Sequence, residues 1–168
     1  MAAAVNHNNG TLLVNTYATP PVLNATGSDL VPIWMKQATC AIPTSGTDLA
    51  HSVYAMCRVF SSDIPLSIKA GCTALTGGAL SVGLFLPNVV TVAATNSDHL
   101  FATSISYSSA AVPTEQRWTN QDVTTTGQRI WQLLGLASDP EAYYDLGFYS
   151  TTAATAAGTL GLIYEFTR

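Results

Sequence analysis

Alternation of apolar and polar side chains constrains this chain more than any other feature of its sequence. From residue 64 to residue 74 every second side chain is apolar, and the positions between are mostly polar or small. The same period of two recurs at residues 80 to 86 and 160 to 166. Successive side chains of a β-strand point to opposite faces, so this period predicts strands with one apolar and one polar face. We therefore expect an antiparallel sheet built around these segments.

Three consecutive strands are predicted between residues 49 and 86. The first, at residues 50 to 60, is apolar on both faces and rich in Val, Tyr and Phe, which suits a strand covered on two sides. Turns at residues 61 to 63 and 76 to 78 connect the three strands, and Gly77-Gly78 favours the second turn because glycine reaches positive φ easily. Further strands are predicted at residues 89 to 94, 103 to 108, 143 to 151 and 159 to 167.

One short helix is predicted at about residues 128 to 135. Ile130, Leu133 and Leu134 form an apolar stripe at helical spacing, and Gly135 stands where a helix C-terminal cap is expected. Seven or eight strands with one short helix are the inventory of a β-sandwich or a jelly roll. We therefore expect residues 46 to 168 to form a mainly β, antiparallel, jelly-roll-like sandwich.

Charged residues are scarce in this chain. They make up 10% of its 168 residues, against about 25% in typical soluble domains. Such a surface is either neutral and polar or hidden in contacts with other chains, because the cores of interfaces are depleted in charge. The six basic residues are scattered singly, which argues against direct binding of nucleic acid. No apolar run approaches 18 residues, so no membrane span is expected.

The N-terminal stretch differs from the rest in composition. Residues 1 to 28 contain no Asp, Glu, Lys or Arg, and Pro20-Pro21 opposes a helix or a central strand. Two interpretations stand: a frayed tail, or an extended arm that becomes ordered on a neighbouring subunit. We expect residues 1 to 45 to form such an arm. We expect seven residues to lie at interfaces: Thr11, Val14, Tyr17, Val22, Leu23, Trp34 and Trp118. The two tryptophans are included because tryptophan is enriched at binding hot spots.

No enzymatic constellation stands out, and we predict no catalytic, cofactor-binding or metal-binding residues. His51 and His99 each lie near an aspartate but have no third partner to orient them. The cysteines Cys40, Cys57 and Cys72 lack metal-type spacing, and we expect them to be small buried side chains in a reducing compartment. The sequence thus predicts a protein that is not an enzyme and needs no cofactor.

A set of short motifs follows a fixed order along residues 45 to 168. From the N-terminal side they are MCRVF (56–60), IPLSI (64–68), TGG (76–78), VGLF (82–85), DHLFA (98–102), GQRIWQLLGL (127–136), DP (139–140), YDL (144–146) and GTL (158–160). In this order they resemble small structural proteins of tailed bacteriophages, in particular capsid decoration, or cement, proteins with a jelly-roll-like β fold. The first 45 residues share with that family only an extended, charge-poor character.

The resemblance implies assembly and not catalysis. Proteins of that family sit on the outside of the icosahedral head, often as trimers that clamp neighbouring major capsid subunits. The expected partners are therefore further copies of this chain in a homotrimer and a major capsid protein. The expected location is the capsid exterior of a virion, after synthesis in the host cytoplasm. Two alternatives stand beside it: a carbohydrate- or receptor-binding β-sandwich of a virion, and a head–tail connector or tail structural subunit.

Overall fold

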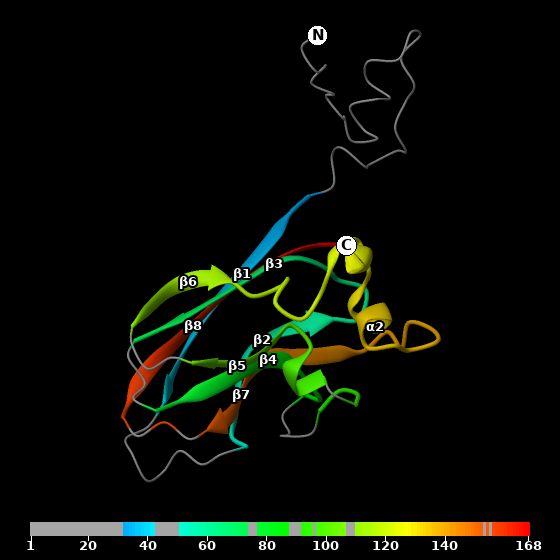
Figure 1. Ribbon diagram of the computed structural model, residues 1–168. Helices are drawn as coiled ribbons and strands as arrows, with labels where there is room; N and C mark the ends of the chain where they lie inside the picture. Colours follow the sequence, from blue (N-terminus) through cyan, green and yellow to red (C-terminus); the bar gives the residue numbers. More distant parts are fainter. Residues whose placement is uncertain are drawn as a thin grey trace, which may run out of the picture. The chain divides into compact units, whose positions relative to one another are not determined.

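The computed structural model describes residues 32–42, 51–73, 77–87, 92–95, 97–106, 110–152, 154 and 156–168 (Figure 1). Within these residues it has eight strands: β1 (Trp34–Ile42), β2 (Val53–Phe60), β3 (Ile64–Cys72), β4 (Ala79–Phe85), β5 (Ala102–Ser106), β6 (Ala111–Glu115), β7 (Tyr143–Thr152) and β8 (Gly158–Thr167). The helical segments of the same part are η1 (Ser97–His99), η2 (Val123–Thr125) and α2 (Ile130–Leu133).

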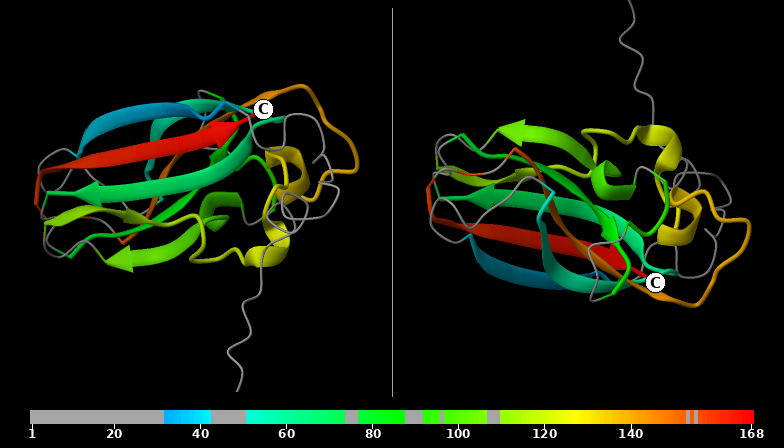
Figure 2. Two further views of the ribbon diagram at one scale, coloured as in Figure 1. Left: turned by 90° about the horizontal axis from the view of Figure 1, so that it is seen from above. Right: turned by 90° about the horizontal axis from the view of Figure 1, so that it is seen from below.

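The strands form two antiparallel sheets of four, in the orders β1-β8-β3-β6 and β2-β7-β4-β5. The left view of Figure 2 shows β1, β8, β3 and β6 side by side in that order. Eight strands in two sheets, with the first strand paired to the eighth and the second to the seventh, have the order of a jelly roll. The predicted mainly β, antiparallel sandwich is confirmed.

The structure corrects the prediction that the strands of residues 49 to 86 are neighbours. β2 and β4 lie in one sheet with β7 between them, whereas β3 lies in the other sheet beside β8. The reason is that a sheet with one apolar face needs a second layer to cover it, and β2, β3 and β4 alternate between the two layers. The two ten-residue strands are central: β7 pairs with β2 and β4 in one sheet, and β8 pairs with β1 and β3 in the other. β2 is consequently an edge strand, and its residues Ala55 and Arg58 are exposed.

Two edge strands lie where the sequence predicts no strand of the sandwich. β1 falls within residues 1 to 45, for which we expect an arm, yet it pairs with β8 over nine positions, from Trp34 opposite Phe166 to Ile42 opposite Gly158. β6 falls in a stretch for which the sequence predicts no strand, and it contains Pro113. Proline cannot donate to a sheet ladder, but an edge strand has one side that needs no donor.

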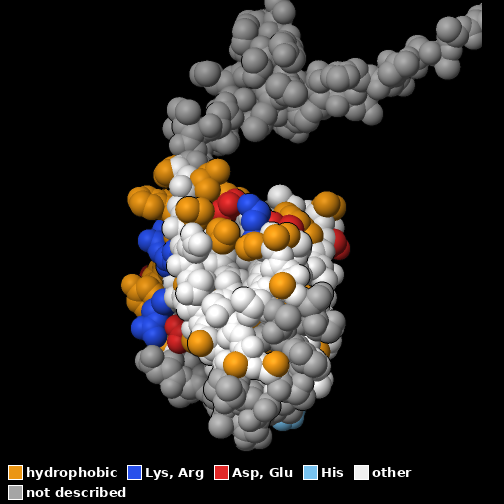
Figure 3. Space-filling view, turned by 90° about the vertical axis from the view of Figure 1, so that its left-hand side faces the viewer, with side chains coloured by type: hydrophobic (Ala, Val, Ile, Leu, Met, Phe, Trp, Pro, Cys, Tyr) orange, Lys and Arg blue, Asp and Glu red, His pale blue; other side chains and the backbone are white. Residues whose placement is uncertain are grey.

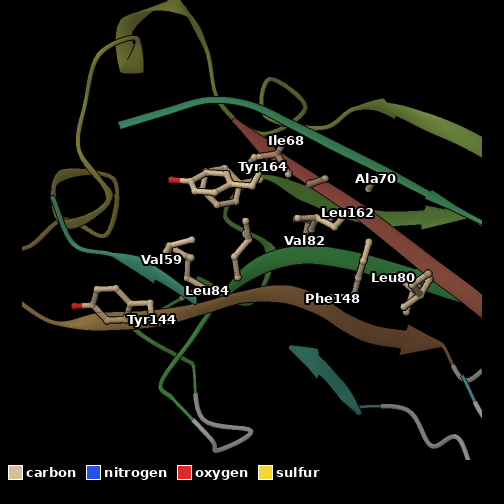
Figure 4. Close-up of a cluster of buried hydrophobic side chains, with 14 of the residues drawn as sticks. Val59, Ile68, Ala70, Leu80, Val82, Leu84, Tyr144, Phe148, Leu162 and Tyr164 are labelled. Atoms are coloured by element: carbon tan, nitrogen blue, oxygen red, sulfur yellow. The ribbon is translucent and has the colours of Figure 1, made fainter. Parts of the chain in front are cut away.

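The core lies between the two sheets. Figure 4 shows Tyr164 and Leu162 of β8 and Ile68 of β3 facing Val82 of β4 and Phe148 of β7. All five side chains are at most 1% exposed. The alternation predicted for residues 160 to 166 is confirmed, because the buried side chains in that range are Leu160, Leu162, Tyr164 and Phe166.

A β-bulge changes the alternation predicted for β3. The register between β3 and β8 shifts between Pro65 and Ser67. Pro65 is buried and Leu66 only half-buried, whereas the uninterrupted pattern places Leu66 in the core and Pro65 outside. The bulge inserts one extra residue and so reverses the faces on its N-terminal side. Beyond it, Ile68 and Ala70 face the core as predicted.

The predicted helix is present but short. α2 spans four residues, and its buried Ile130 joins the core. The backbone N–H groups of Ile130 and Trp131 donate to the carbonyls of Asp63 and Ser61 in the β2–β3 turn, at 2.9 and 3.1 Å. The turn therefore supplies acceptors at the helix start, and Gly135, with φ of +71°, ends it. None of the helices in the described part of the chain is long and apolar enough to cross a membrane.

The β2–β3 turn is also the anchor of the C-terminal end of β8. The side chain of Asp63 is fully buried. One of its carboxylate oxygens accepts from the backbone N–H of Phe60 at 3.0 Å. The other accepts from Nε of Arg168 at 2.6 Å. Strand β2, helix α2 and the residue after β8 thus meet at one turn.

Candidate interaction surface

The residues considered for chemistry do not converge. His51 forms a hydrogen bond through Nδ1 with the hydroxyl of Tyr149, and Nδ1 of His99 lies 2.9 Å from the carboxylate of the adjacent Asp98. Among the described residues, no group of three or more His, Cys, Asp or Glu side chains is arranged to hold a metal ion. The search for a functional site therefore turns to surfaces that can bind other chains.

No disulfide joins any two of the three cysteines, and each is partly buried. Burial is the main cause that raises the pKa of the Cys57 thiol to about 11, and the nearby ammonium of Lys36 opposes the shift. The thiol is therefore protonated at neutral pH and acts as a small hydrophobic side chain.

β1 is the most regular of the four edge strands. β6 contains Pro113, β2 has a register shift between Ala55 and Cys57, and β5 has Ser104 at a φ of +47°. Bulges and prolines are devices that discourage a further strand from pairing with an edge. β1 has neither, and its register with β8 is continuous over nine positions. Its one charged residue, Lys36, donates from its ammonium to the carbonyl of Arg58.

An apolar patch stands at the start of β1. We define it as Ile33, Trp34 and Met35, which are 68%, 55% and 64% exposed. Figure 3 shows hydrophobic side chains gathered at the end of the β-domain where the described chain begins. Three large apolar side chains exposed in succession cost solubility unless another chain covers them. With the regular edge of β1, the patch marks a surface suited to association.

The outer face of the sheet β1-β8-β3-β6 changes character along the strands. Near the middle of the sheet the ammonium of Lys69 lies 3.0 Å from the carboxylate of Glu165. In the next row across the strands, Thr39 is opposite Gly161, and Gly161 is opposite Gly71. A shallow groove of about 210 Å³ lies over this row, and none of the described residues that line it is charged. A charged and an uncharged region thus adjoin on one face.

Arg117 and Trp118 form a second notable cluster. The Arg117 side chain is fully buried, its guanidinium lies 4.5 Å from the centre of the Trp118 ring, and one of its NH₂ groups donates to the carbonyl of Thr125 at 3.2 Å. Burial is the main cause that lowers the pKa of Arg117. The indole offers a face on which a planar guanidinium stacks favourably. Trp118, 41% exposed, therefore shields Arg117 from water.

Comparison with known proteins shows a similarity of structure but none of sequence family. No protein-family model matches the chain, and no curated protein does. A chain of the structure titled "Capsid of Ralstonia phage GP4" aligns with a TM-score of 0.53 over 88% of this chain and 89% of that chain, at 13% sequence identity. The two chains share a fold. A chain of "Cyanophage Pam1 capsid asymmetric unit" aligns over 90% of this chain and 96% of that chain, at 11% identity and a TM-score of 0.48.

The described residues include two of the seven expected interface residues. Trp34 lies in the apolar patch and Trp118 lies on Arg117, so the structure does not bring the two tryptophans into one described cluster. Their interface roles stay predictions. The other five, Thr11, Val14, Tyr17, Val22 and Leu23, lie outside the described residues.

Replacing Trp118 with alanine should lower the free energy of unfolding by about 1 to 2 kcal/mol, the range for a partly desolvated cation–π contact. The reason is that the guanidinium of Arg117 would lose the aromatic face that lies 4.5 Å from it. Urea denaturation of the variant and the wild type measures the difference. Trp118→Phe keeps an aromatic face and should lose less than half as much. Equal losses for the two variants, or none for alanine, would contradict the stacking role.

Proposed function

We propose that this chain is a virion structural protein that binds the outside of a phage capsid and stabilises the shell by bridging major capsid subunits. The observation that carries the proposal is the jelly-roll fold, which the chain shares over most of both lengths with a chain from the capsid of Ralstonia phage GP4. The exterior position, the homotrimer and the major capsid protein as partner come from the resemblance of the ordered sequence motifs.

Surface features of the β-domain support an assembly role. The regular edge of β1 and the exposed apolar patch both suit contact with another chain. Few charges need to be desolvated when such a surface is covered, since only 10% of the residues are charged. Trp34 is the residue of the patch with the largest apolar area, so we propose it as the anchor of the capsid contact.

The proposed mechanism is thermodynamic linkage. A protein that binds the assembled shell and not its free subunits stabilises the shell by about 2.7 kcal/mol per site when its free concentration is a hundred times Kd. A homotrimer that touches several capsid subunits at once gains further from effective concentration, since its second and third contacts form within one complex. Weak individual contacts can therefore strengthen a shell against the pressure of packaged DNA.

The proposal is tested on particles that lack the protein. Such particles should release DNA at a lower temperature than complete particles, and adding the purified chain back should restore the higher temperature. Trp34→Ala should bind these particles at least about tenfold more weakly, the loss that corresponds to one hot-spot side chain. The matched control is Val123→Ala, which removes an 82% exposed apolar side chain outside the patch and should bind normally.

Equal release temperatures with and without the chain would overturn the cement role. Equal weakening by Trp34→Ala and Val123→Ala would overturn the assignment of the patch. The glycan-binding alternative predicts hits on a glycan array. It needs aromatic faces open to a sugar, and Trp118 already has Arg117 near its ring.

A further inference from the structure

Gly161 is unusual because nothing inside the described domain requires a glycine there. It lies near the middle of β8, a central strand, where glycine normally weakens a sheet. A Cβ atom at this position would meet only the carbonyl oxygen of Gly71, at an ordinary 3.9 Å. The glycines with positive φ are Gly77, Gly127 and Gly135, so the backbone of Gly161 gives no reason either. A glycine of this kind marks a place where another backbone approaches closely.

The groove over Gly161 has a defined shape. Gly161 and Gly71 form its floor, and Thr39 of β1 and Pro113 of β6 line it on either side. Gly71, in contrast to Gly161, is needed by the fold, because a Cβ there would lie 2.7 Å from the carbonyl oxygen of Ala111. The groove is thus a shallow channel across two central strands, deepened because both floor residues lack side chains.

Chemistry restricts what can lie in this groove. The residues that line it carry no charge, and the nearest charged row, Lys69 with Glu165, is already paired. A charged segment placed there would lose water without gaining a partner, which is costly. The occupant must therefore be an uncharged stretch of extended chain that can lie flat on a glycine floor.

We propose that the groove binds a short piece, around Tyr17, of residues 11 to 23 in the N-terminal segment of a second copy of this chain. Residues 1 to 28 carry no charged side chain, which matches the uncharged groove. Pro20-Pro21 favours extended backbone, which suits a shallow channel. The inference deepens the proposed function and rests on it, because it names one contact between copies of the assembled protein.

The length of the segment allows contact with a neighbour. Tyr17 lies 15 residues before the start of the described chain, and an extended chain spans about 3.3 Å per residue, so Tyr17 can lie up to about 50 Å from that point. The longest strands of the domain have ten residues and span about 33 Å. A segment anchored at the start of β1 can therefore pass beyond its own domain to the groove of a neighbouring copy.

The experiment uses the full chain with Tyr17 replaced by the photo-crosslinker p-benzoylphenylalanine. Copies labelled with ¹⁴N and ¹⁵N are mixed in equal amounts, allowed to exchange, and irradiated. Mass spectrometry then identifies the joined peptides. We expect cross-links from position 17 to the peptides that contain Thr39, Pro113 or Gly161, with mixed isotopes in the joined pairs. Cross-links only within one isotope, or only to other peptides, would overturn the inference.

Filling the groove provides the matched control. Gly161→Ile has room for its Cβ and adds a β-branched side chain that favours a strand, so it should block the groove without unfolding the domain. We expect the cross-link yield to fall by about tenfold with isoleucine, as for the loss of one well-packed contact, and by a smaller factor with Gly161→Ala, which adds a single methyl group to the floor. Thr39→Tyr, at the exposed edge of the groove, is a second blocking variant that leaves the floor unchanged.

Undiminished cross-linking in both blocked variants would overturn the inference even if particles are still stabilised. Conversely, specific cross-linking between copies that fail to stabilise capsids would leave the groove contact standing and refute the cement role. Failure of the one is therefore distinguishable from failure of the other.

Discussion

Gly83→Ala should be strongly destabilising, because Gly83 has the tightest surroundings among the described glycines of the sandwich. η1 and its flanking residues pack directly on β4 at this position. A Cβ on Gly83 would lie closer than 3.0 Å to the backbone atoms of Ser97 and Asp98, a separation that real Cβ atoms do not show. Backbone cannot rotate away as a flexible side chain can. We expect a loss of at least about 3 kcal/mol, at the upper end for overpacked cores.

The loss should be visible in both thermal and urea denaturation. A change of that size corresponds to a fall in Tm of about 6 to 12 °C for a domain of this length. Gly161→Ala is the matched control, since it adds the same methyl group to the central strand β8 at a position where there is space for it. It should leave Tm unchanged or raise it slightly, because alanine restricts the unfolded chain. Equal shifts for the two variants would show that η1 does not pack on Gly83 as described.

Of the substitutions proposed for this protein, Arg168→Ala should cause the second largest loss in the free energy of unfolding. Asp63 is completely buried, and Arg168 supplies one of the two donors to its carboxylate. Without Arg168 a buried negative charge keeps only the N–H of Phe60 as its partner, and such uncompensated charges are strongly destabilising. Arg168 itself is 54% exposed, so water can partly replace it. We therefore expect a loss of about 2 kcal/mol, below the full range for a buried pair.

A double-mutant cycle separates this interaction from simple loss of contact. Asp63→Asn removes the charge but keeps a side-chain oxygen that can accept from the N–H of Phe60. In that background Arg168→Ala should cost less than half of its cost in the wild type, because no buried charge is left unpaired. The free energy of unfolding from urea titrations of the four proteins measures the coupling. Strictly additive losses would contradict the ion pair.

The sequence predicts β8 well because buried and partly exposed side chains alternate along it from Leu160 to Phe166. In β8 each inward position is a large apolar residue, and the pattern is readable without the structure. The side chains of β1 also alternate between the inner and outer faces of the sheet, but at two positions the polarity of the side chain is the opposite of what its face predicts. Lys36 takes an inward position, which it tolerates because its ammonium reaches the carbonyl of Arg58, and Met35 takes an outward one. An edge strand permits both departures, so its pattern is hidden.

The assignment of strands to sheets was beyond the sequence for a different reason. Alternation says which side chains share a face but not which strand lies next to which. The β2–β3 turn looks like a hairpin turn, yet it crosses from one sheet to the other and is stabilised by partners from α2 and by Arg168. Those partners are distant in the sequence, and no local pattern reports them.

The candidate surface was predictable in part. The sequence predicts Trp34 as an interface residue because it is a tryptophan in a stretch without a regular pattern. The structure places it exposed at the start of β1, and its role stays a prediction. The groove was not expected. Its signal in the sequence is Gly161 at an outward position of a strong alternation, but Thr39, Gly71 and Gly161 come together only through the pairing of β1, β8 and β3.

The pairing of β1 with β8 has a consequence for synthesis of the chain. Trp34 pairs with Phe166, so one sheet cannot close until the ribosome has released nearly all of the described residues. Pairings between strands so distant along the chain form slowly, because the entropy cost of closing a long loop comes before any stabilising contact is made. During translation the early strands would wait with their apolar faces uncovered, a state in which chaperones bind and in which nascent copies can associate prematurely.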